Sequence, residues 1–582
     1  MIAKTRSIIS ALSALIVSSA LPAQPAVENA PADPTLAVMK AELDRSLPRL
    51  KTAGAAPVYF LGYRLYQSTW SSISAENGAL RGRYPEQAWA MLAVDLRVGD
   101  PHFDNTHRMR GRAWDRRAAV FESTSSGALV PIEPSSTALQ QLLWLKTDEA
   151  FKEAQKRYSE LKGNNAVLAE EEDSADDFSL EEPHKDLEIA PLPHVSTSEW
   201  ENRVRELSQE FTKYPYIRDS SVNFMAAPVQ RYIVTSEGSE IASVLPYYSA
   251  NMSISSLTND GMDLWLYQSA SARKPNELPD DKKLTAMATE LAKEMDQLRQ
   301  APPADPYVGP AILSGRASAV LFHEILGHRI EGLRQKDESD ARTFSNRIGT
   351  KIMPSFLSVV DDPTIKELHG RELAGYYAYD DEGTPAQRVE IVNHGVLTGF
   401  LLSRSPLKGF PHSNGHGRGS PGWNPVARQG NLIIEADPSK QLSEAKLRAM
   451  LIKEVKRQHK PYGLYFTELS GGETYTSAAR PQSISLYPLL VYRIYADGRP
   501  DELIRGVDLV GTPLSLLERI VAAGTDIDTF NGRCGAESGE VPVSATAPSL
   551  LIQSIEVQRK AKGLKKSPIL PAPDSPVGEK AK

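Results

Sequence analysis

The chain has 582 residues, of which 41% are hydrophobic, 24% charged and 7% aromatic, and this composition excludes a mainly disordered, collagenous or coiled-coil protein. A net charge of −7 provides no basic field, so nucleic-acid binding is not expected. The single cysteine, Cys534, excludes an internal disulfide, and the length predicts roughly two to four domains.

The N-terminus has the pattern of an export signal. Lys4 and Arg6 precede a short apolar run at 8–20 with small residues after it, which predicts a secretory signal peptide over residues 1–23. The protein is then exported to the periplasm or the extracellular space. The run is shorter than the about 20 residues that a spanning helix needs, so no membrane span is expected after signal removal; an uncleaved anchor is the alternative.

Residues 30–300 are predicted to form a mixed α/β domain. Acidic residues at 170–182, followed by prolines, predict a solvated connector at 165–194. The proline cluster at 301–306 marks the predicted domain boundary. The expected elements are helices at 35–46, which Pro48 would end, 137–162, 196–211 (opened by a capping box of Ser196 and Glu199) and 283–300, and strands at 88–98 and 232–235.

Residues 305–558 are predicted to form a second domain that is rich in strands. One helix is expected at 314–335, and glycine-punctuated hairpins and a buried strand at 489–495 follow it. The tail, 559–582, is basic and proline-bearing and is predicted to be disordered. The expected fold class is α+β in two domains, an N-terminal mixed α/β domain and a β-rich C-terminal domain.

The helix at 314–335 carries the clearest chemical signal, His323-Glu324-Ile325-Leu326-Gly327-His328. Two imidazoles beside a carboxylate are the groups of a hydrolytic zinc site. The histidines are five residues apart, about 140° around an ideal helix. One metal can bind both only if the helix is overwound, bulged or broken, and Gly327 is where that could happen. Alternatively, His328 pairs with Glu324 or Glu331 in a surface network, and the spacing leaves both possibilities open.

Cys534 is a candidate third ligand. A thiolate binds zinc well, and ligation would explain an unpaired cysteine in an exported chain. The glycines at 532 and 535 would let its loop approach the metal closely. The alternative is that Cys534 is simply a small buried hydrophobic residue.

The segment YVGPAILSGRASAVLFHEILGHRIEG (307–332) resembles the TldD/PmbA family of metallopeptidases, specifically its TldD-like branch with an HExxxH motif. The resemblance continues at 380–388, 413–418, 507–517 and 532–543, and more loosely at 96–107. It implies Zn²⁺ bound by His323, His328 and Cys534, with Glu324 as the general base for a water activated by the metal. It also implies a homodimer, or a heterodimer with a related subunit, enclosing a cavity in which unfolded or extended peptide binds by strand addition.

The predicted function is therefore an exported zinc-dependent peptidase that cleaves unfolded or extended polypeptides. The alternatives are a non-catalytic peptide-binding or scaffold subunit of a TldD/PmbA-like complex, or a zinc amidase that acts on cell-wall peptides.

Further polar residues are weaker candidates. His416 and Gly417, in a glycine-rich run, could bind substrate. The acidic residues 380–382 could orient the zinc histidines or form an exposed turn. His102 and His107 are expected to be solvated residues at a strand end rather than metal ligands.

Overall fold

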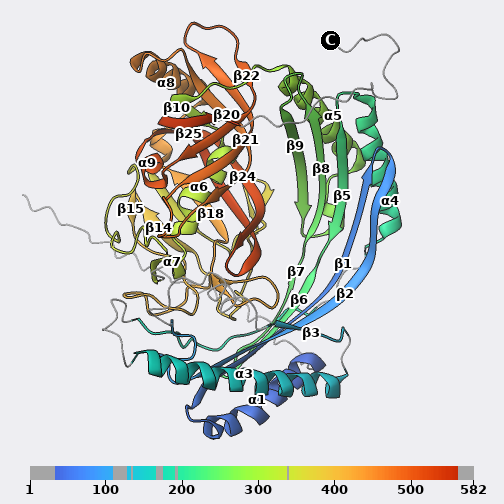
Figure 1. Ribbon diagram of the computed structural model, residues 1–582, viewed down its shortest axis with the longest axis vertical. Coiled ribbons are helices and arrows are strands. Elements are labelled where there is room, and N and C mark those ends of the chain that lie inside the picture. Colours follow the sequence, from blue (N-terminus) through green and yellow to red (C-terminus); the bar gives the residue numbers. More distant parts are fainter. Residues whose placement is uncertain are drawn as a thin grey trace, which may run out of the picture.

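The computed structural model describes residues 33–108, 127–132, 135–165, 175–189, 195–336 and 340–560. Figure 1 shows two large sheets whose strands come from the first and the last parts of the chain, with helices packed on each. The predicted signal peptide, residues 166–174 and 190–194 of the predicted connector, and nearly all of the tail lie outside the described residues. The predicted α+β class is confirmed.

The first sheet follows the order β4-β7-β6-β1-β5-β8-β9, and β2 and β3 extend it beside β1. Helices α1 and α3 lie against one end of this sheet, and α4 and α5 cover a face of β5, β8 and β9 (Figure 1). The strands are β1 (Val58–Glu76), β2 (Ala79–Val98), β3 (Gly127–Val130), β4 (Lys185–Leu187), β5 (Asp219–Ala226), β6 (Val229–Thr235), β7 (Glu240–Leu245), β8 (Tyr248–Leu257) and β9 (Asp263–Ala272). The helices are α1 (Pro34–Ala53), α3 (Ser136–Asn165), α4 (Thr197–Glu210) and α5 (Asp281–Gln300).

Three local features differ from the sequence predictions. The strand expected at 88–98 is only the second half of β2, which joins β1 through a tight turn at Asn77-Gly78, where both residues have positive φ (51° and 79°). Helix α1 continues past Pro48. Proline has no N–H to donate to the carbonyl of Asp44, four residues earlier, but Asp44 and Pro48 are both exposed, so water can replace that hydrogen bond. Ser196 precedes α4 but does not cap it with its side chain, so the predicted capping box is absent there.

The second sheet follows the order β10-β20-β21-β23-β25-β18-β11-β14-β15, with β19, β22 and β24 beside it. It curves around helix α6 (Gly315–Ile325), and together they enclose a large apolar core. The strands are β10 (Tyr307–Leu313), β11 (Leu357–Asp361), β14 (Val389–Asn393), β15 (Val396–Leu397), β18 (Asn431–Ala436), β19 (Gln441–Leu442), β20 (Tyr462–Thr474), β21 (Ile484–Tyr495), β22 (Glu502–Ile504), β23 (Val507–Gly511), β24 (Ile520–Ala536) and β25 (Gly539–Arg559).

Smaller elements complete this part of the chain. They are the short helix α7 (Leu333–Lys336), the helices α8 (Glu444–Arg457) and α9 (Pro513–Glu518), and two small ribbons, β12 (Glu367–Leu368) with β13 (Arg371–Glu372) and β16 (Gly417–Arg418) with β17 (Val426–Ala427). Among the described residues, no helix is both long and apolar enough to cross a membrane.

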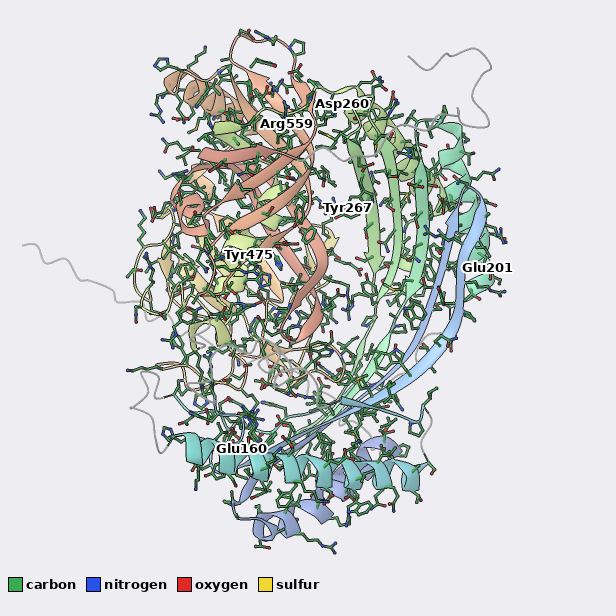
Figure 2. All side chains as sticks on the ribbon, in the orientation of Figure 1. Glu160, Glu201, Asp260, Tyr267, Tyr475 and Arg559 are labelled. Atoms are coloured by element: carbon green, nitrogen blue, oxygen red, sulfur yellow. The ribbon has the colours of Figure 1, made fainter. Side chains whose placement is uncertain are left out.

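Buried polar contacts join the two parts of the molecule. Arg231 of β6 donates to the Asp381 carboxylate at 2.7 Å, and Arg404 donates twice to the carbonyl oxygen of Ser179, at 3.0 and 2.7 Å. On the edge strand β9, the Tyr267 hydroxyl, labelled in Figure 2, donates to the carbonyl oxygen of Ser470 at 3.3 Å.

Candidate metal centre

Helix α6 positions the first two residues of the motif. Ser314 begins the helix, because its hydroxyl accepts the backbone N–H of Ala317 at 3.1 Å. Every residue of α6 except Arg316 is buried against the surrounding strands. The helix therefore has a fixed position, and it holds His323 and Glu324 in its last turn inside the protein.

The helix breaks between the two histidines. Helix α6 ends at Ile325, and residues Gly327–Arg329 form a 3₁₀ turn. A Cβ atom at Gly327 would lie 2.0 Å from Oε1 of Gln429, so any other residue would require the buried Gln429 side chain to move. The helix predicted at 314–335 is thus wrong as one helix, and the structure has at Gly327 the interruption that a metal shared by both histidines would need. The break turns the ring of His328 toward that of His323, with 5.0 Å between the ring centroids.

Strand β24 supplies the third residue. Cys534 pairs with Val541 in the β24–β25 hairpin, and its Sγ lies 3.3 Å from Nε2 of His328, a residue 206 positions earlier in the chain. One donor atom from each of His323, His328 and Cys534 lies within 4.8 Å of the others. All three residues are buried, so the structure brings together the ligands that the sequence predicted.

The electrostatics of this cluster favour the form of cysteine that binds metals. Burial by itself would raise the pKa of Cys534, but the adjacent His328 and His323 lower it well below its usual value. Burial likewise opposes the charged forms of the histidines, yet the neighbouring Cys534 raises the pKa of both.

Glu331 holds the far side of the His328 ring. Its Oε2 lies 3.3 Å from His328 Nδ1 and accepts the Nε–H of Arg334 at 2.9 Å. Burial would raise the pKa of Glu331, but His328 and Arg334 lower it to about 2. The sequence analysis gave pairing of His328 with Glu331 as a surface alternative to metal binding. In the structure this pair is buried, and His328 contacts Cys534 as well. The spacing of three residues was the signal that could have identified it.

Glu324 packs closely against β20. A Cβ atom at Gly472 would lie 2.9 Å from Cγ of Glu324, so glycine at this position lets the strand approach the Glu324 side chain. Glu324 is 5% exposed, and among the described residues the side chain of Arg329 donates to its backbone carbonyl oxygen at 2.9 Å, not to its carboxylate.

The acidic residues 380–382 have a different role from either one predicted. Asp380 accepts the backbone N–H of Gly417 at 2.9 Å, Asp381 pairs with Arg231, and Glu382 accepts the backbone N–H of Arg404 at 2.7 Å. They neither orient the histidines of the cluster nor form an exposed turn, because they connect the glycine-rich loop and the first sheet.

The other sequence candidates have structural contacts. His416 is fully buried, with Nε2 3.3 Å from Asp361 and Nδ1 3.0 Å from Asn414, and Gly417 is packed against Glu382. A substrate-binding role for His416 and Gly417 stays a prediction. His102 is exposed as expected, but the expectation that His107 is solvated is wrong, because its ring is 11% exposed and contacts the buried Asp177 at 2.8 Å. The described residues contain no cluster of potential metal ligands besides His323, His328 and Cys534.

The donor set fits zinc. Tetrahedral zinc at ordinary Zn–N and Zn–S distances places its donors roughly 3.4–3.6 Å apart. The 3.3 Å between Cys534 Sγ and His328 Nε2 is close to that spacing. Three protein donors would leave a fourth position for water or substrate, which is the pattern of catalytic rather than structural zinc.

The comparisons with known proteins point to one family. A family model for the PmbA/TldA metallopeptidase C-terminal domain matches residues 307–559. The chain is 26% identical over 252 residues to a metalloprotease TldD homolog of Buchnera aphidicola, covering 43% of this chain and about half (47%) of that protein. It is 24% identical over 356 residues to a zinc metalloprotease TldD homolog of Saccharolobus solfataricus, covering 60% and 73%.

The fold comparison agrees. The crystal structure of TldE from Thermococcus kodakarensis superimposes with a TM-score of 0.58 at 14% identity, covering 89% of this chain and 99% of that one. The matched residues 307–559 include His323, His328 and Cys534, so this part of the chain is similar to the PmbA/TldA metallopeptidase C-terminal domain.

Proposed function

We propose that the protein is an exported zinc-dependent peptidase that cleaves unfolded or extended polypeptides. The observation that carries the proposal is the buried cluster of His323, His328 and Cys534 with the buried carboxylate of Glu324 next to it in sequence. The names of the relatives support the same reaction class, since they are metalloproteases.

Each residue has a distinct part in this proposal. His323, His328 and Cys534 would hold zinc, which when bound polarises the scissile carbonyl and lowers the pKa of the attacking water. Glu324 accepts a proton from that water and delivers it to the leaving amine. Glu331 keeps His328 in one ring orientation through Nδ1.

The burial of the site limits what could reach it. The three ligands are only 5–7% exposed, so a folded domain could not place its backbone beside them, whereas a single extended strand could. Binding such a strand by backbone hydrogen bonds would suit a site surrounded by sheet. Export, and assembly as a homodimer or with a related subunit, are part of the proposal.

The experiment is mass spectrometry of unfolded casein incubated with the zinc-loaded mature protein. Glu324→Gln is the control variant, because it keeps the size of the side chain but cannot accept a proton. We expect fragments from the wild type and a loss of about 10²–10⁴-fold in rate for the variant, with equal zinc content.

Two other outcomes would change the assignment. Equal cleavage by wild type and variant would remove Glu324 as the base. If zinc is bound but linear peptides stay intact, cleavage of cell-wall peptide fragments would indicate the amidase, and no cleavage at all would favour the non-catalytic binding subunit.

A further inference from the structure

The hairpin that carries Cys534 is attached to the rest of the site by a buried arginine. Arg428 follows β17 and is fully buried. Its Nη2 donates to the carbonyl oxygen of Cys534 at 2.6 Å, and its Nη1 donates to Ser538 Oγ and to the carbonyl oxygen of Gly539, both at 3.0 Å. One guanidinium therefore contacts both strands of the hairpin and the turn between them.

The same guanidinium faces the carboxylate that orients His328. Nε of Arg428 lies 3.5 Å from Oε1 of Glu331, and the other oxygen of Glu331 contacts His328 and Arg334. Arg334 in turn donates to Glu537 in the turn of the hairpin, at 3.0 and 2.9 Å. Arg428 and Arg334 thus each contact both the hairpin that carries Cys534 and the Glu331 carboxylate beside His328.

Arg428 is itself held firmly. Its backbone N–H donates to the carbonyl oxygen of His416 at 2.9 Å, and the ring of His416 contacts Asp361 in the core. A planar guanidinium with five donors can hold several acceptors at once in one geometry, which a lysine ammonium cannot do.

We propose, building on the proposed function, that Arg428 is a positioning residue for the metal centre: it holds the Cys534 hairpin in register with the Glu331–His328 pair, so that thiol and imidazoles can bind one ion. Metal ligands from segments so far apart in the chain need such support, because a site loses affinity when its donors move by about 0.5 Å.

The test measures metal binding, not peptide cleavage. Zn²⁺ dissociation constants would be determined by chelator competition for wild type, Arg428→Lys and Arg404→Lys. Co²⁺ spectra would report cysteine ligation through the sulfur-to-cobalt charge-transfer band. Arg404 is the matched control, since it is also a buried arginine but contacts Ser179 and Glu237 instead of the cluster.

We expect Arg428→Lys to weaken Zn²⁺ binding by about 10–100-fold and to reduce the charge-transfer band. Arg404→Lys should bind both ions like the wild type even if its melting temperature falls. The proposal is overturned if Arg428→Lys retains the affinity and the spectrum of the wild type, if both variants lose affinity equally, or if the wild type binds neither ion. Tight binding by the wild type without peptide cleavage would overturn the proposed function alone.

A second variant covers the case in which Arg428→Lys does not fold. Glu331→Gln leaves the arginine in place and removes the charge that it shares with His328. We expect weaker Zn²⁺ binding while the charge-transfer band remains, because Arg428 still holds Cys534. Unchanged Zn²⁺ affinity in Glu331→Gln would contradict the proposal that the Glu331–His328 pair and the Cys534 hairpin are held together for metal binding.

Discussion

At the scale of single residues, the candidate site is a set of ordinary side chains made unusual by their neighbours. Cys534 has a strongly lowered pKa because it is next to two imidazoles, and His328 has a fixed orientation because Glu331 contacts its far nitrogen. Glu324 differs from these residues, since the side-chain hydrogen bond that it accepts from Arg329 in the described part of the chain goes to its backbone carbonyl oxygen rather than to its carboxylate. Under the proposed function, this contrast would suit two ligands that hold a metal in place and a base that accepts a proton.

The thiol has a direct test. Cys534→Ser keeps the size of the side chain but replaces a good zinc ligand with a poor one. Loss of an outer contact to a metal ligand typically costs 10–100-fold in affinity, so loss of the ligand itself should exceed about 100-fold. Zinc titration with a competing chelator measures this, and circular dichroism checks that the variant is folded. Unchanged zinc affinity would exclude Cys534 as a ligand.

At the scale of elements, the interruption of the motif helix decides whether the two histidines can share a metal. We expect Gly327→Ala to destabilise the protein by about 1–3 kcal/mol, because its methyl group would overlap the Gln429 side chain. It should also weaken zinc binding by moving His328. Urea denaturation measures the first effect and chelator competition the second.

A matched control is available in α3. Gly163→Ala adds the same methyl group where no atom lies within 4 Å, and alanine favours the helix by up to about 1 kcal/mol. If Gly327→Ala is as stable as Gly163→Ala, the close packing at the break is not what requires glycine.

Helix α5 contains a group that makes stability depend on pH. Burial, reinforced by Glu290 and Glu468, raises the pKa of Glu294 from 4.5 to about 7. The folded state then holds this proton more tightly than the unfolded state. The contribution of Glu294 to stability is therefore most favourable below pH 4.5, and it declines as the pH rises to about 7.

Glu294→Gln should accordingly raise the melting temperature more at pH 8 than at pH 5, because glutamine avoids the buried charge. Calorimetry of wild type and variant at the two pH values provides the comparison. An equal difference at both values would mean that Glu294 ionises normally.

At the scale of the whole molecule, a buried ion pair joins the first sheet to the second part of the chain. Arg231 of β6 contacts Asp381, and both side chains are almost completely shielded from water. Arg231→Met leaves the Asp381 carboxylate buried without its main partner, which typically costs about 3–5 kcal/mol. Urea denaturation of Arg231→Met, Asp381→Asn and the double variant would test this. Strictly additive costs would show that the pair is not coupled.

The sequence by itself determined the chemistry and part of the local geometry. Residue types and spacing were enough to nominate His323, Glu324, His328 and Cys534, and to show that a metal shared by the two histidines would need a helix break, for which Gly327 was the candidate. They were enough because donor chemistry belongs to single side chains, and because helical geometry relates residues only a few positions apart.

Only the tertiary structure decided what surrounds these residues. It brought Cys534 to a histidine 206 positions away, buried the whole cluster, and selected Glu331 rather than residues 380–382 as the carboxylate beside His328. It also placed Arg428 between the two sides of the site. Such contacts depend on how distant strands pair and on which polar groups must find partners once water is excluded, and no local periodicity encodes either.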